Sequence, residues 1–338
     1  MKMLMRHTRV CAARGCKKSL DMTTKTLDPQ FIYITNNIIN MTEHVKRNRF
    51  LKPSDDVFSH NAWDDIEWTE EMYQEAEKKL IEQKNLSVLT SEGLNEIEEK
   101  AKDKWEDFYR VHNDRFFKDR QWIFTEFPEI LEKLDCDRLD CKLLEVGCGV
   151  GNAVAHILKS NENADLHIYC FDISEQAINI LQQRDLYKSN CDRITAFRAD
   201  LTSDFDNIIC QKIQESSLDF ILAIFTLSAL KPASMRESIA RLATLLKPNG
   251  MLLFRDYARY DMAQLRFRPK SYLGENYYKR NDGTTSYFFT KEVVEELFSS
   301  AGLERVQLVE DKRMLVNRAK SLKMCRCWIQ AKYKKPAV

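Results

Sequence analysis

Three glycines at alternate positions directly follow a short apolar run in the middle of the chain. The run 142–146 is followed by Gly147, Gly149 and Gly151. Glycine is needed where a side chain would block the close approach of a ligand to a turn, and a helix that starts there offers backbone N–H groups. The pattern predicts a ligand-binding turn between a strand and a helix. The alternative is an ordinary glycine-rich connection.

An acidic residue marks the tip of the next predicted strand. The apolar run 166–171 ends in Asp172, twenty-five residues after Gly147. A carboxylate at the tip of the second strand of a β-α-β unit can accept from both hydroxyls of a ribose. The dinucleotide fingerprint would require a third glycine where this chain has Asn152. Since no pyrophosphate is indicated, the pattern favours a single nucleoside, and S-adenosylmethionine fits it.

Two further strand ends should face the same region, because ligands of such sheets bind beyond the carboxyl ends of the strands. Asp200 follows the third predicted strand and can accept from an adenine amino group, while Leu201 offers a backbone N–H. Ile224 lies at the tip of the fourth and would form an apolar wall. The alternatives are a loop-capping aspartate and an isoleucine of the core.

Predicted strands and helices, which would position these residues, alternate from Cys141 onward. This alternation predicts an α/β fold, a Rossmann-like, mostly parallel, seven-stranded sheet with helices on both faces and an antiparallel edge. An N-terminal helical extension precedes it, with one helix from Thr69, its N-cap, to about Gln83 and another ending near Tyr109. The predicted strands are 142–146, 166–171, 193–198, 218–225, 250–256, 304–310 and 324–331, and the predicted helices are 151–160, 174–184, 232–246 and 290–300.

Composition narrows the class of protein. The 338 residues suffice for one large domain and an appendage, and no apolar run is long enough to cross a bilayer. Ten scattered cysteines lack paired spacing, so neither a metal site nor a disulfide framework is favoured and a reducing compartment fits. Residues 312–335 hold nine Lys or Arg and no acid, whereas residues 64–107 hold fifteen acids and six Lys or Arg. Such segregation suits a basic face for a polyanion, or simply solvated surfaces.

Several longer motifs are similar to those of one enzyme family. They are Trp105-Glu-Asp-Phe-Tyr109, Arg115-Phe-Phe-Lys-Asp-Arg120, Gly147-Cys-Gly-Val-Gly-Asn152, Phe225-Thr-Leu-Ser-Ala229, Arg255-Asp-Tyr257, Leu265-Arg-Phe267 and Gly274-Glu-Asn-Tyr-Tyr-Lys-Arg-Asn-Asp-Gly-Thr284. In them the chain resembles the tRNA N3-methylcytidine methyltransferases over about residues 48–332. The segment His60-Asn-Ala-Trp-Asp-Asp-Ile-Glu-Trp68 is similar to the branch with methyltransferase-like proteins two and eight. The resemblance implies methylation of cytidine 32 in the anticodon loop of threonine and some arginine tRNAs.

The same resemblance implies S-adenosylmethionine as the cofactor. The family resemblance adds Trp105 and Tyr109 to the predicted contacts. They are four residues apart and so share one face of a helix. An aromatic pair in this position can cover a sulfonium group by cation–π attraction. Without the family resemblance, the two aromatic residues would be interpreted as a row of side chains that packs against the core. The implied cofactor contacts are Trp105, Tyr109, Gly147, Asp172, Asp200, Leu201 and Ile224.

The expected chemistry asks little of a general base, because N3 of neutral cytosine already carries a lone pair. The product base is cationic, so a nearby carboxylate would stabilise the developing charge, and Asp256 after the fifth strand is the candidate. The alternative for Asp256 is a structural partner of Arg255 or Arg259. The sequence 226–228 lacks the Asn/Asp-Pro-Pro motif of many amino-group methyltransferases, which favours a ring nitrogen. Aromatic residues such as Phe225 and Tyr257 offer surfaces for a flipped base.

Binding of the tRNA anticodon stem-loop should come from basic residues near the cofactor end of the fold. A protein cofactor for tRNA selection is a further candidate partner, and no membrane is expected. Two alternatives stay open: a methyltransferase acting on a small molecule or protein, and a non-catalytic RNA-binding subunit. The predicted RNA contacts are Arg115, Lys118, Arg120, Arg255, Arg259, Arg266, Arg268, Lys279 and Arg280.

We predict four segments along the chain. They are a disordered basic tail (1–30), an N-terminal helical, tRNA-binding and cofactor-lid extension (31–125), a methyltransferase domain (126–333) and a short tail (334–338). The acid-free residues 1–20 resemble a mitochondrial presequence in charge, but Gly15 interrupts their apolar pattern and Ser19 is their one serine. We therefore expect a cytoplasmic protein, with mitochondria as the alternative.

Overall fold

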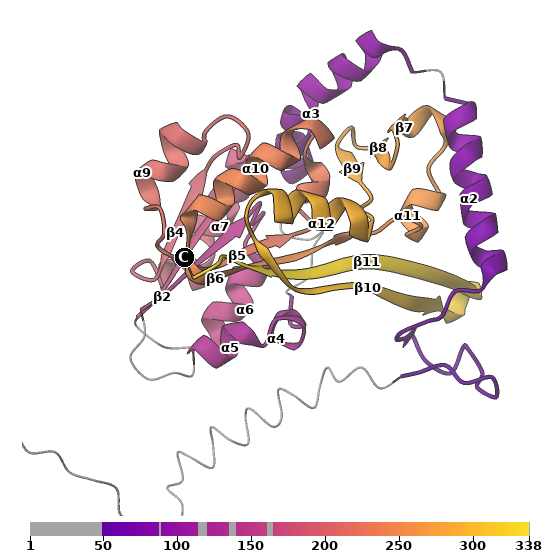
Figure 1. Cartoon of the computed structure of the whole chain (residues 1–338), viewed down its shortest axis with the longest axis horizontal. Coiled ribbons are helices and arrows are strands. Elements are labelled where there is room, and N and C mark those ends of the chain that lie inside the picture. The colour runs from indigo at the N-terminus through magenta and orange to yellow at the C-terminus, as the bar shows by residue number, and fades with distance from the viewer. Residues whose placement is uncertain (1–48, 88, 114–119, 135–139, 161–164, 338) are drawn as a thin grey trace, which may run out of the picture. The chain divides into compact units, whose positions relative to one another are not determined.

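The computed structural model describes residues 49–87, 89–113, 120–134, 140–160 and 165–337 (Figure 1). The chain divides into two units, Met1–Lys46 and Arg47–Val338, and every described residue belongs to the second. The predicted disordered tail 1–30 therefore lies outside the described residues. Within the described ranges, no helix is both long enough and apolar enough to span a membrane.

An eight-stranded sheet forms the centre of the second unit, in the order β1-β10-β11-β6-β5-β2-β3-β4. The five strands from β6 to β4 in this order run parallel, and β11 pairs antiparallel with both β6 and β10. The strands are β1 (Ala62–Trp63), β2 (Cys141–Val146), β3 (Leu166–Asp172), β4 (Ile194–Arg198), β5 (Leu218–Ile224), β6 (Leu246–Tyr257), β10 (Glu304–Asn317) and β11 (Leu322–Lys334).

This sheet confirms the predicted α/β fold with its antiparallel edge. All seven predicted strands are present, and the last three are longer than predicted. The eighth, β1, pairs with β10 through Ala62 opposite Leu315 and Trp63 opposite Met314. Two residues are too few to show an alternating pattern, which is why the sequence did not indicate this strand.

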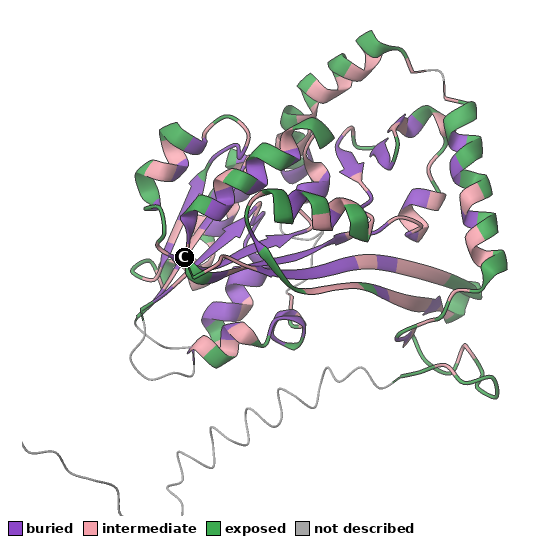
Figure 2. Cartoon of the chain, viewed as in Figure 1, coloured by how far each residue is buried: buried purple, intermediate pink, exposed green. Residues whose placement is uncertain are grey.

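Helices cover both faces of the sheet (Figure 1). Leu143 and Leu144 of β2 are fully buried in different core clusters, because successive side chains of a strand point to opposite faces. Figure 2 shows the resulting buried layer of strands beneath half-exposed helices. One cluster includes α4 (Ile123–Glu126), α5 (Glu129–Leu134), α6 (Asn152–Ser160) and α7 (Glu175–Gln183); the other includes the π-helical turn Phe205–Ile209, α10 (Pro232–Leu245) and α12 (Lys291–Ser300).

The N-terminal helices are α2 (Glu70–Asn85) and α3 (Ser91–His112). The Thr69 side chain accepts from the Met72 N–H, which confirms the predicted cap of α2. On the same helix, buried Gln83 donates to the carbonyls of Gln264 (3.0 Å) and Phe267 (2.9 Å). These bonds fix α2 against the region around α11 (Met262–Leu265) and a small antiparallel sheet of β7 (Tyr272–Gly274), β8 (Tyr277–Lys279) and β9 (Thr285–Tyr287).

Candidate functional site

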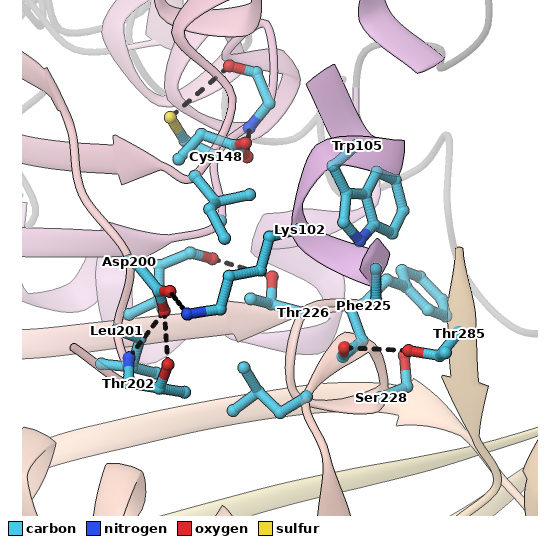
Figure 3. Close-up of a pocket in the computed structure, with 18 of the residues that line it drawn as sticks. Lys102, Trp105, Cys148, Asp200, Leu201, Thr202, Phe225, Thr226, Ser228 and Thr285 are labelled. Carbon is cyan, nitrogen blue, oxygen red and sulfur yellow. Dashed lines mark hydrogen bonds and ion pairs between the residues drawn. The ribbon is translucent and has the colours of Figure 1, made fainter. Parts of the chain in front are cut away.

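A cavity of about 370 Å³ lies at the carboxyl ends of the parallel strands. The segments that follow β2, β3, β4 and β5 line it, together with α3 and residues of the small sheet (Figure 3). This is the edge where ligands of such sheets bind. The cavity brings together every predicted cofactor contact: Trp105, Tyr109, Gly147, Asp172, Asp200, Leu201 and Ile224.

The glycine turn forms one wall of this cavity. Gly147 and Gly149 both have positive φ, 62° and 53°, a region that side chains other than glycine rarely enter. A Cβ at Gly147 would also overlap the Thr226 side chain, and a Cβ at Gly149 would overlap the hydroxyl of Tyr109. Both positions therefore require glycine for backbone conformation and for the close approach of α3.

Asp172 is held rigidly at the tip of β3. One carboxylate oxygen accepts from the Gly149 N–H (2.8 Å) and the other from the Ser174 N–H (2.9 Å). Burial raises its pKa to about 6 in spite of these bonds. Each oxygen keeps a further lone pair, so the carboxylate can still accept from two neighbouring hydroxyl groups.

Asp200 already has a partner in this structure. Its carboxylate contacts the ammonium group of Lys102 from α3 and accepts from the backbone N–H (2.8 Å) and hydroxyl (2.7 Å) of Thr202 (Figure 3). Burial raises the pKa of Asp200, but the bonds from Lys102 and Thr202 outweigh it and hold the pKa below its ordinary value. Asp200 is therefore an anionic acceptor at physiological pH.

Helix α3 carries the predicted aromatic pair over the cavity. The Trp105 and Tyr109 rings lie 6.4 Å apart between centroids, inclined at 32°. Glu106, between them in sequence, accepts from the Ser174 hydroxyl (2.7 Å) and the Gln176 N–H (3.2 Å) at the start of α7. These bonds connect α3 to the start of α7 and keep both rings at the cavity.

A further part of the cavity lining is aromatic and cationic. The Phe225 and Tyr257 rings lie 5.0 Å apart, with the Arg120 guanidinium 5.4 Å from the first and the Arg280 guanidinium 5.4 Å from the second. Phe225 has φ of 55°, an uncommon backbone conformation that orients it after β5. An aromatic surface of this kind can stack a planar base.

Comparisons with known proteins bear on this site. A family model described as a methyltransferase domain matches residues 144–252. The tRNA N(3)-cytidine methyltransferase METTL2 of Danio rerio is 43% identical over 330 residues, covering 88% of this chain and 92% of the relative. The tRNA N(3)-cytidine methyltransferase METTL2 of Xenopus tropicalis is 42% identical, and the match covers 86% of this chain and 94% of the relative. The tRNA N(3)-methylcytidine methyltransferase trm140 of Schizosaccharomyces pombe is 40% identical, covering 85% of this chain and 91% of the relative.

The chain belongs to the tRNA N(3)-cytidine methyltransferase family. The resemblance seen in its motifs is thereby confirmed, as is the methyltransferase fold class.

The structure corrects the role expected for Asp256 in this methyltransferase. The side chain is fully buried and is absent from the cavity lining. Its carboxylate accepts from the Ser228 N–H (2.9 Å) and the Tyr257 N–H (2.8 Å), and burial raises its pKa to about 6. Asp256 therefore holds the turn after β5 in place behind the cavity lining, without an ion pair to Arg255 or Arg259.

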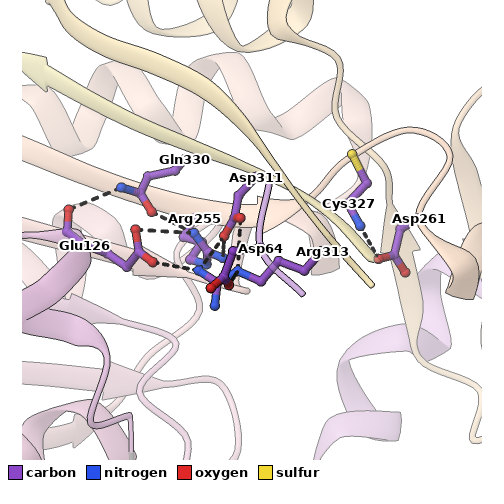
Figure 4. Close-up of polar contacts among 8 residues, drawn as sticks. All are labelled: Asp64, Glu126, Arg255, Asp261, Asp311, Arg313, Cys327 and Gln330. Atoms are coloured by element: carbon purple, nitrogen blue, oxygen red, sulfur yellow. Dashed lines mark hydrogen bonds and ion pairs between the residues drawn. The ribbon is translucent and has the colours of Figure 1, made fainter. Parts of the chain in front are cut away.

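Arg255 was predicted to contact RNA, and this prediction is wrong. Only 4% of the side chain is exposed. Its guanidinium contacts the carboxylate of Asp311 and donates to the Gln330 side chain (2.6 Å) within the polar cluster drawn in Figure 4. A guanidinium enclosed by β6, β10 and β11 cannot reach a phosphate.

The remaining predicted RNA contacts of the methyltransferase differ in accessibility. Arg115 and Lys118 lie outside the described residues. Arg259 is committed to Glu77, which accepts from it at 2.9 Å, and it also donates to Asn276. Arg266 and Arg268 are exposed, and Lys279 is half-buried. The two residues that line the cavity itself are Arg120 and Arg280.

Three cavity residues of the methyltransferase had no sequence signal. Lys102 lies on the same helical face as Trp105 and Tyr109, so the spacing i, i+3, i+7 would have found it once those two were placed. Tyr277 and Thr285 come from β8 and β9, strands of three residues each. The Tyr277 hydroxyl is buried and makes no hydrogen bond of normal geometry, although Thr285 lies beside it.

Proposed function

We propose that this protein transfers a methyl group from S-adenosylmethionine to N3 of a cytidine in tRNA. The target we propose is position 32 of the anticodon loop of threonine tRNAs and some arginine tRNAs. One observation carries the proposal: a single cavity joins a nucleoside-type site around Asp172 to an aromatic, cationic end around Phe225 and Tyr257. The names of the relatives, as tRNA N(3)-cytidine and N(3)-methylcytidine methyltransferases, support the choice of base and atom.

The residues present fit S-adenosylmethionine. Asp172 offers two acceptors for ribose hydroxyls, and Asp200 with Leu201 offers an acceptor and a backbone N–H for the adenine. The turn at Gly147 and Gly149 leaves room where a Cβ would collide. When bound, S-adenosylmethionine supplies an electrophilic methyl group on a positively charged sulfur. The rings of Trp105 and Tyr109 would attract that charge and keep water away.

The target base would enter the end of the cavity between Phe225, Tyr257 and the small sheet. The rings offer a stacking surface, and the unpaired Tyr277 hydroxyl can bond a polar edge of cytosine. A base removed from its stack in this way presents N3 toward the cofactor end. Catalysis would then consist of alignment and exclusion of water, since N3 needs no deprotonation.

Buried carboxylates partly compensate the positive charges of Arg120 and Arg280. Arg120 is close enough for its charge to interact with Glu145 and Asp256, and Arg280 is close enough to interact with Asp256. Two guanidinium groups without these carboxylates would oppose the positive charge that develops on the methylated base. The buried carboxylates therefore act as positioning and charge-balancing residues, with no contact to the base.

The decisive experiment is nucleoside mass spectrometry of tRNA treated with the purified protein and S-adenosylmethionine. We expect N3-methylcytidine in threonine tRNA, and its absence with Asp172→Asn. Binding of S-adenosylmethionine without methyl transfer to any tRNA would contradict the proposal and favour another acceptor. Failure to bind S-adenosylmethionine at all would favour a non-catalytic subunit. We place the enzyme in the cytoplasm, with tRNA as partner and a protein that assists tRNA selection as a further one.

A further inference from the structure

A second cavity, of about 210 Å³, lies outside the proposed active site. It is bounded by the start of α2, the segment after β6, the start of α12 and the paired strands β10 and β11. Its aromatic, charged and small lining residues are Trp68, Tyr73, Tyr260, Arg259, Lys312, Glu292, Glu310, Thr290 and Cys327.

Three aromatic rings of this lining contact one another. The Trp68 ring lies 5.3 Å from Tyr73 and 6.1 Å from Tyr260, and the two tyrosine rings lie 5.7 Å apart. The rings form one aromatic cluster, with the Arg259 guanidinium 5.1 Å from the Tyr260 ring and the Lys312 ammonium 5.2 Å from the Tyr73 ring. Such surfaces bind either planar π systems or cations.

The two cations of this cavity, Lys312 and Arg259, are paired within the protein. Lys312 lies 2.9 Å from the Glu310 carboxylate and donates to the Tyr73 hydroxyl (2.6 Å). Arg259 donates to Glu77 (2.9 Å), outside the lining. Neither cation is free to neutralise an anion. The site is therefore suited to an uncharged group.

One lining residue, Trp68, carries a buried polar atom that lacks a partner. Among the described residues, the indole N–H of Trp68 is buried and makes no hydrogen bond. An indole nitrogen only donates, so the missing group must be an acceptor. A quaternary ammonium has no acceptor and is excluded, whereas a planar heterocycle with a ring nitrogen or carbonyl oxygen supplies both the acceptor and a face for stacking.

A short segment connects the two cavities. Tyr257 lines the proposed active site, while Arg259 and Tyr260 line the second cavity. Tyr260 is the third residue after Tyr257, so their Cα atoms are at most about 11 Å apart. Tyr260 has φ of 69° and is held by its N–H bond to Gln264 (2.7 Å). Strain of this kind in a bulky residue persists where surroundings fix it, often at ligand clamps.

We propose that the second cavity binds a nucleobase of the RNA that neighbours the target cytidine. The base would stack on the surface of Trp68, Tyr73 and Tyr260 and accept from the Trp68 indole N–H. This inference rests on the proposed function, because the RNA supplies the base. Holding a neighbouring nucleotide beside the active site would fix the strand while the target base is turned out of its stack.

The test combines one protein change with single abasic sites in the RNA. Trp68→Phe keeps an aromatic ring and removes the donor. The probe is an anticodon stem-loop of threonine tRNA in which each loop position in turn lacks its base, with binding measured by fluorescence anisotropy. With the wild-type protein, one position next to the target should weaken binding about tenfold when abasic. Trp68→Phe should weaken binding of the intact loop and show little further loss at that position.

Trp63→Phe is the matched control. Its indole lies in the same segment and donates to the Val57 carbonyl (2.8 Å), away from the second cavity, so the abasic effect should persist. Thermal melting and S-adenosylmethionine affinity check that each variant folds. If Trp68→Phe does not fold, Tyr73→Leu serves in its place.

If each abasic site weakened RNA binding by Trp68→Phe as much as it weakens binding by the wild-type protein, this inference would be overturned, even if methylation continues. Absence of methylation by the wild-type protein would overturn the proposed function instead. The two failures are therefore distinguishable.

Discussion

The ammonium group of Lys102 on α3 contacts the carboxylate of Asp200 after β4, across the mouth of the proposed cofactor site. An adenine amino group would have to share this carboxylate with the lysine. We therefore expect Lys102→Met to tighten S-adenosylmethionine binding a few-fold in calorimetric titration. Lys104→Met is the control, because Lys104 pairs with Asp107 on the outer side of the same helix. Weaker binding by Lys102→Met would make the lysine a contributor to the nucleoside site.

Asp172→Asn should weaken S-adenosylmethionine binding roughly tenfold to a hundredfold, the loss expected for a charged acceptor of about 1–3 kcal/mol. Asparagine is preferred to alanine because it keeps the side-chain volume and one of the two oxygens that accept from the Gly149 and Ser174 N–H groups. Asp185→Asn, on the exposed helix Asp185–Lys188, should leave affinity unchanged. Titration calorimetry with melting curves measures both, and wild-type affinity in Asp172→Asn would remove the residue from the site.

Buried carboxylates should make the unfolding free energy depend on pH. Burial raises the pKa of Glu145 from 4.5 to about 7 and that of Asp256 from 3.8 to about 6. The folded state then holds protons that the unfolded chain releases, so this contribution to stability is present below about pH 4 and is lost as pH rises to about 7. For Glu145 the shift corresponds to roughly 3 kcal/mol.

Glu145→Gln should therefore gain stability relative to the wild type as pH rises from 5 to 8. Urea unfolding across this range measures the difference. Glu296→Gln, at an exposed ion pair with Arg236, is the control and should follow the wild-type curve. If the unfolding free energies of Glu145→Gln and the wild type changed equally with pH, the Glu145 carboxyl group would not be titrating between pH 5 and 8.

Arg266 and Arg268 are exposed next to α11 and are suited to phosphate contact. Reversing both charges to glutamate should weaken tRNA binding and reduce its log–log salt slope by about one unit per lost contact. Lys188→Glu with Lys212→Glu changes the same charge near α7 and the π-helical turn and should have a smaller effect. An unaltered slope would place the two arginines away from the RNA.

Deleting residues 1–21 should leave methylation of cytosolic threonine tRNA within a few-fold of the full chain. The expectation follows from the acid-free, serine-poor sequence of this stretch, which lacks the pattern of an amphipathic helix. Assays of both proteins with one tRNA preparation measure it. Mitochondrial import of a C-terminally tagged full-length protein that depends on this stretch would contradict the cytoplasmic assignment.

The strand-tip residues were predictable because position along a parallel sheet follows from chain order. Asp172, Asp200 and Ile224 each end an apolar run, so the topology alone brings them to one edge. Lys102 was not predictable in this way, since its contact with Asp200 depends on how α3 packs over that edge. The spacing of Lys102 from Trp105 and Tyr109 places it on their helical face, but the contact with Asp200 cannot be read from that spacing.

The errors at Arg255 and Asp256 have a related cause. Both lie near the end of β6, where ligand contacts are expected, but β6 continues to Tyr257 and pairs with β11 along this stretch. The pairing encloses Arg255 with Asp311, and it buries Asp256 behind Ser228. The predicted strand 250–256 already contained both residues, but the sequence could not show that pairing with β11 would enclose their side chains.

The segment around β1 has one more consequence, for the outer edge of the sheet. The Val316 N–H donates to the Asn61 carbonyl and the Ile66 N–H to the Lys312 carbonyl, so residues 61–66 occupy the free side of β10 there. Further along β10, charged Glu304 and Arg305 and a bulge before Gln307 interrupt the edge. Open strand edges recruit other chains, and charges, bulges and covering segments prevent it. The same stretch that presents Trp68 thus shields this sheet from edge-to-edge aggregation.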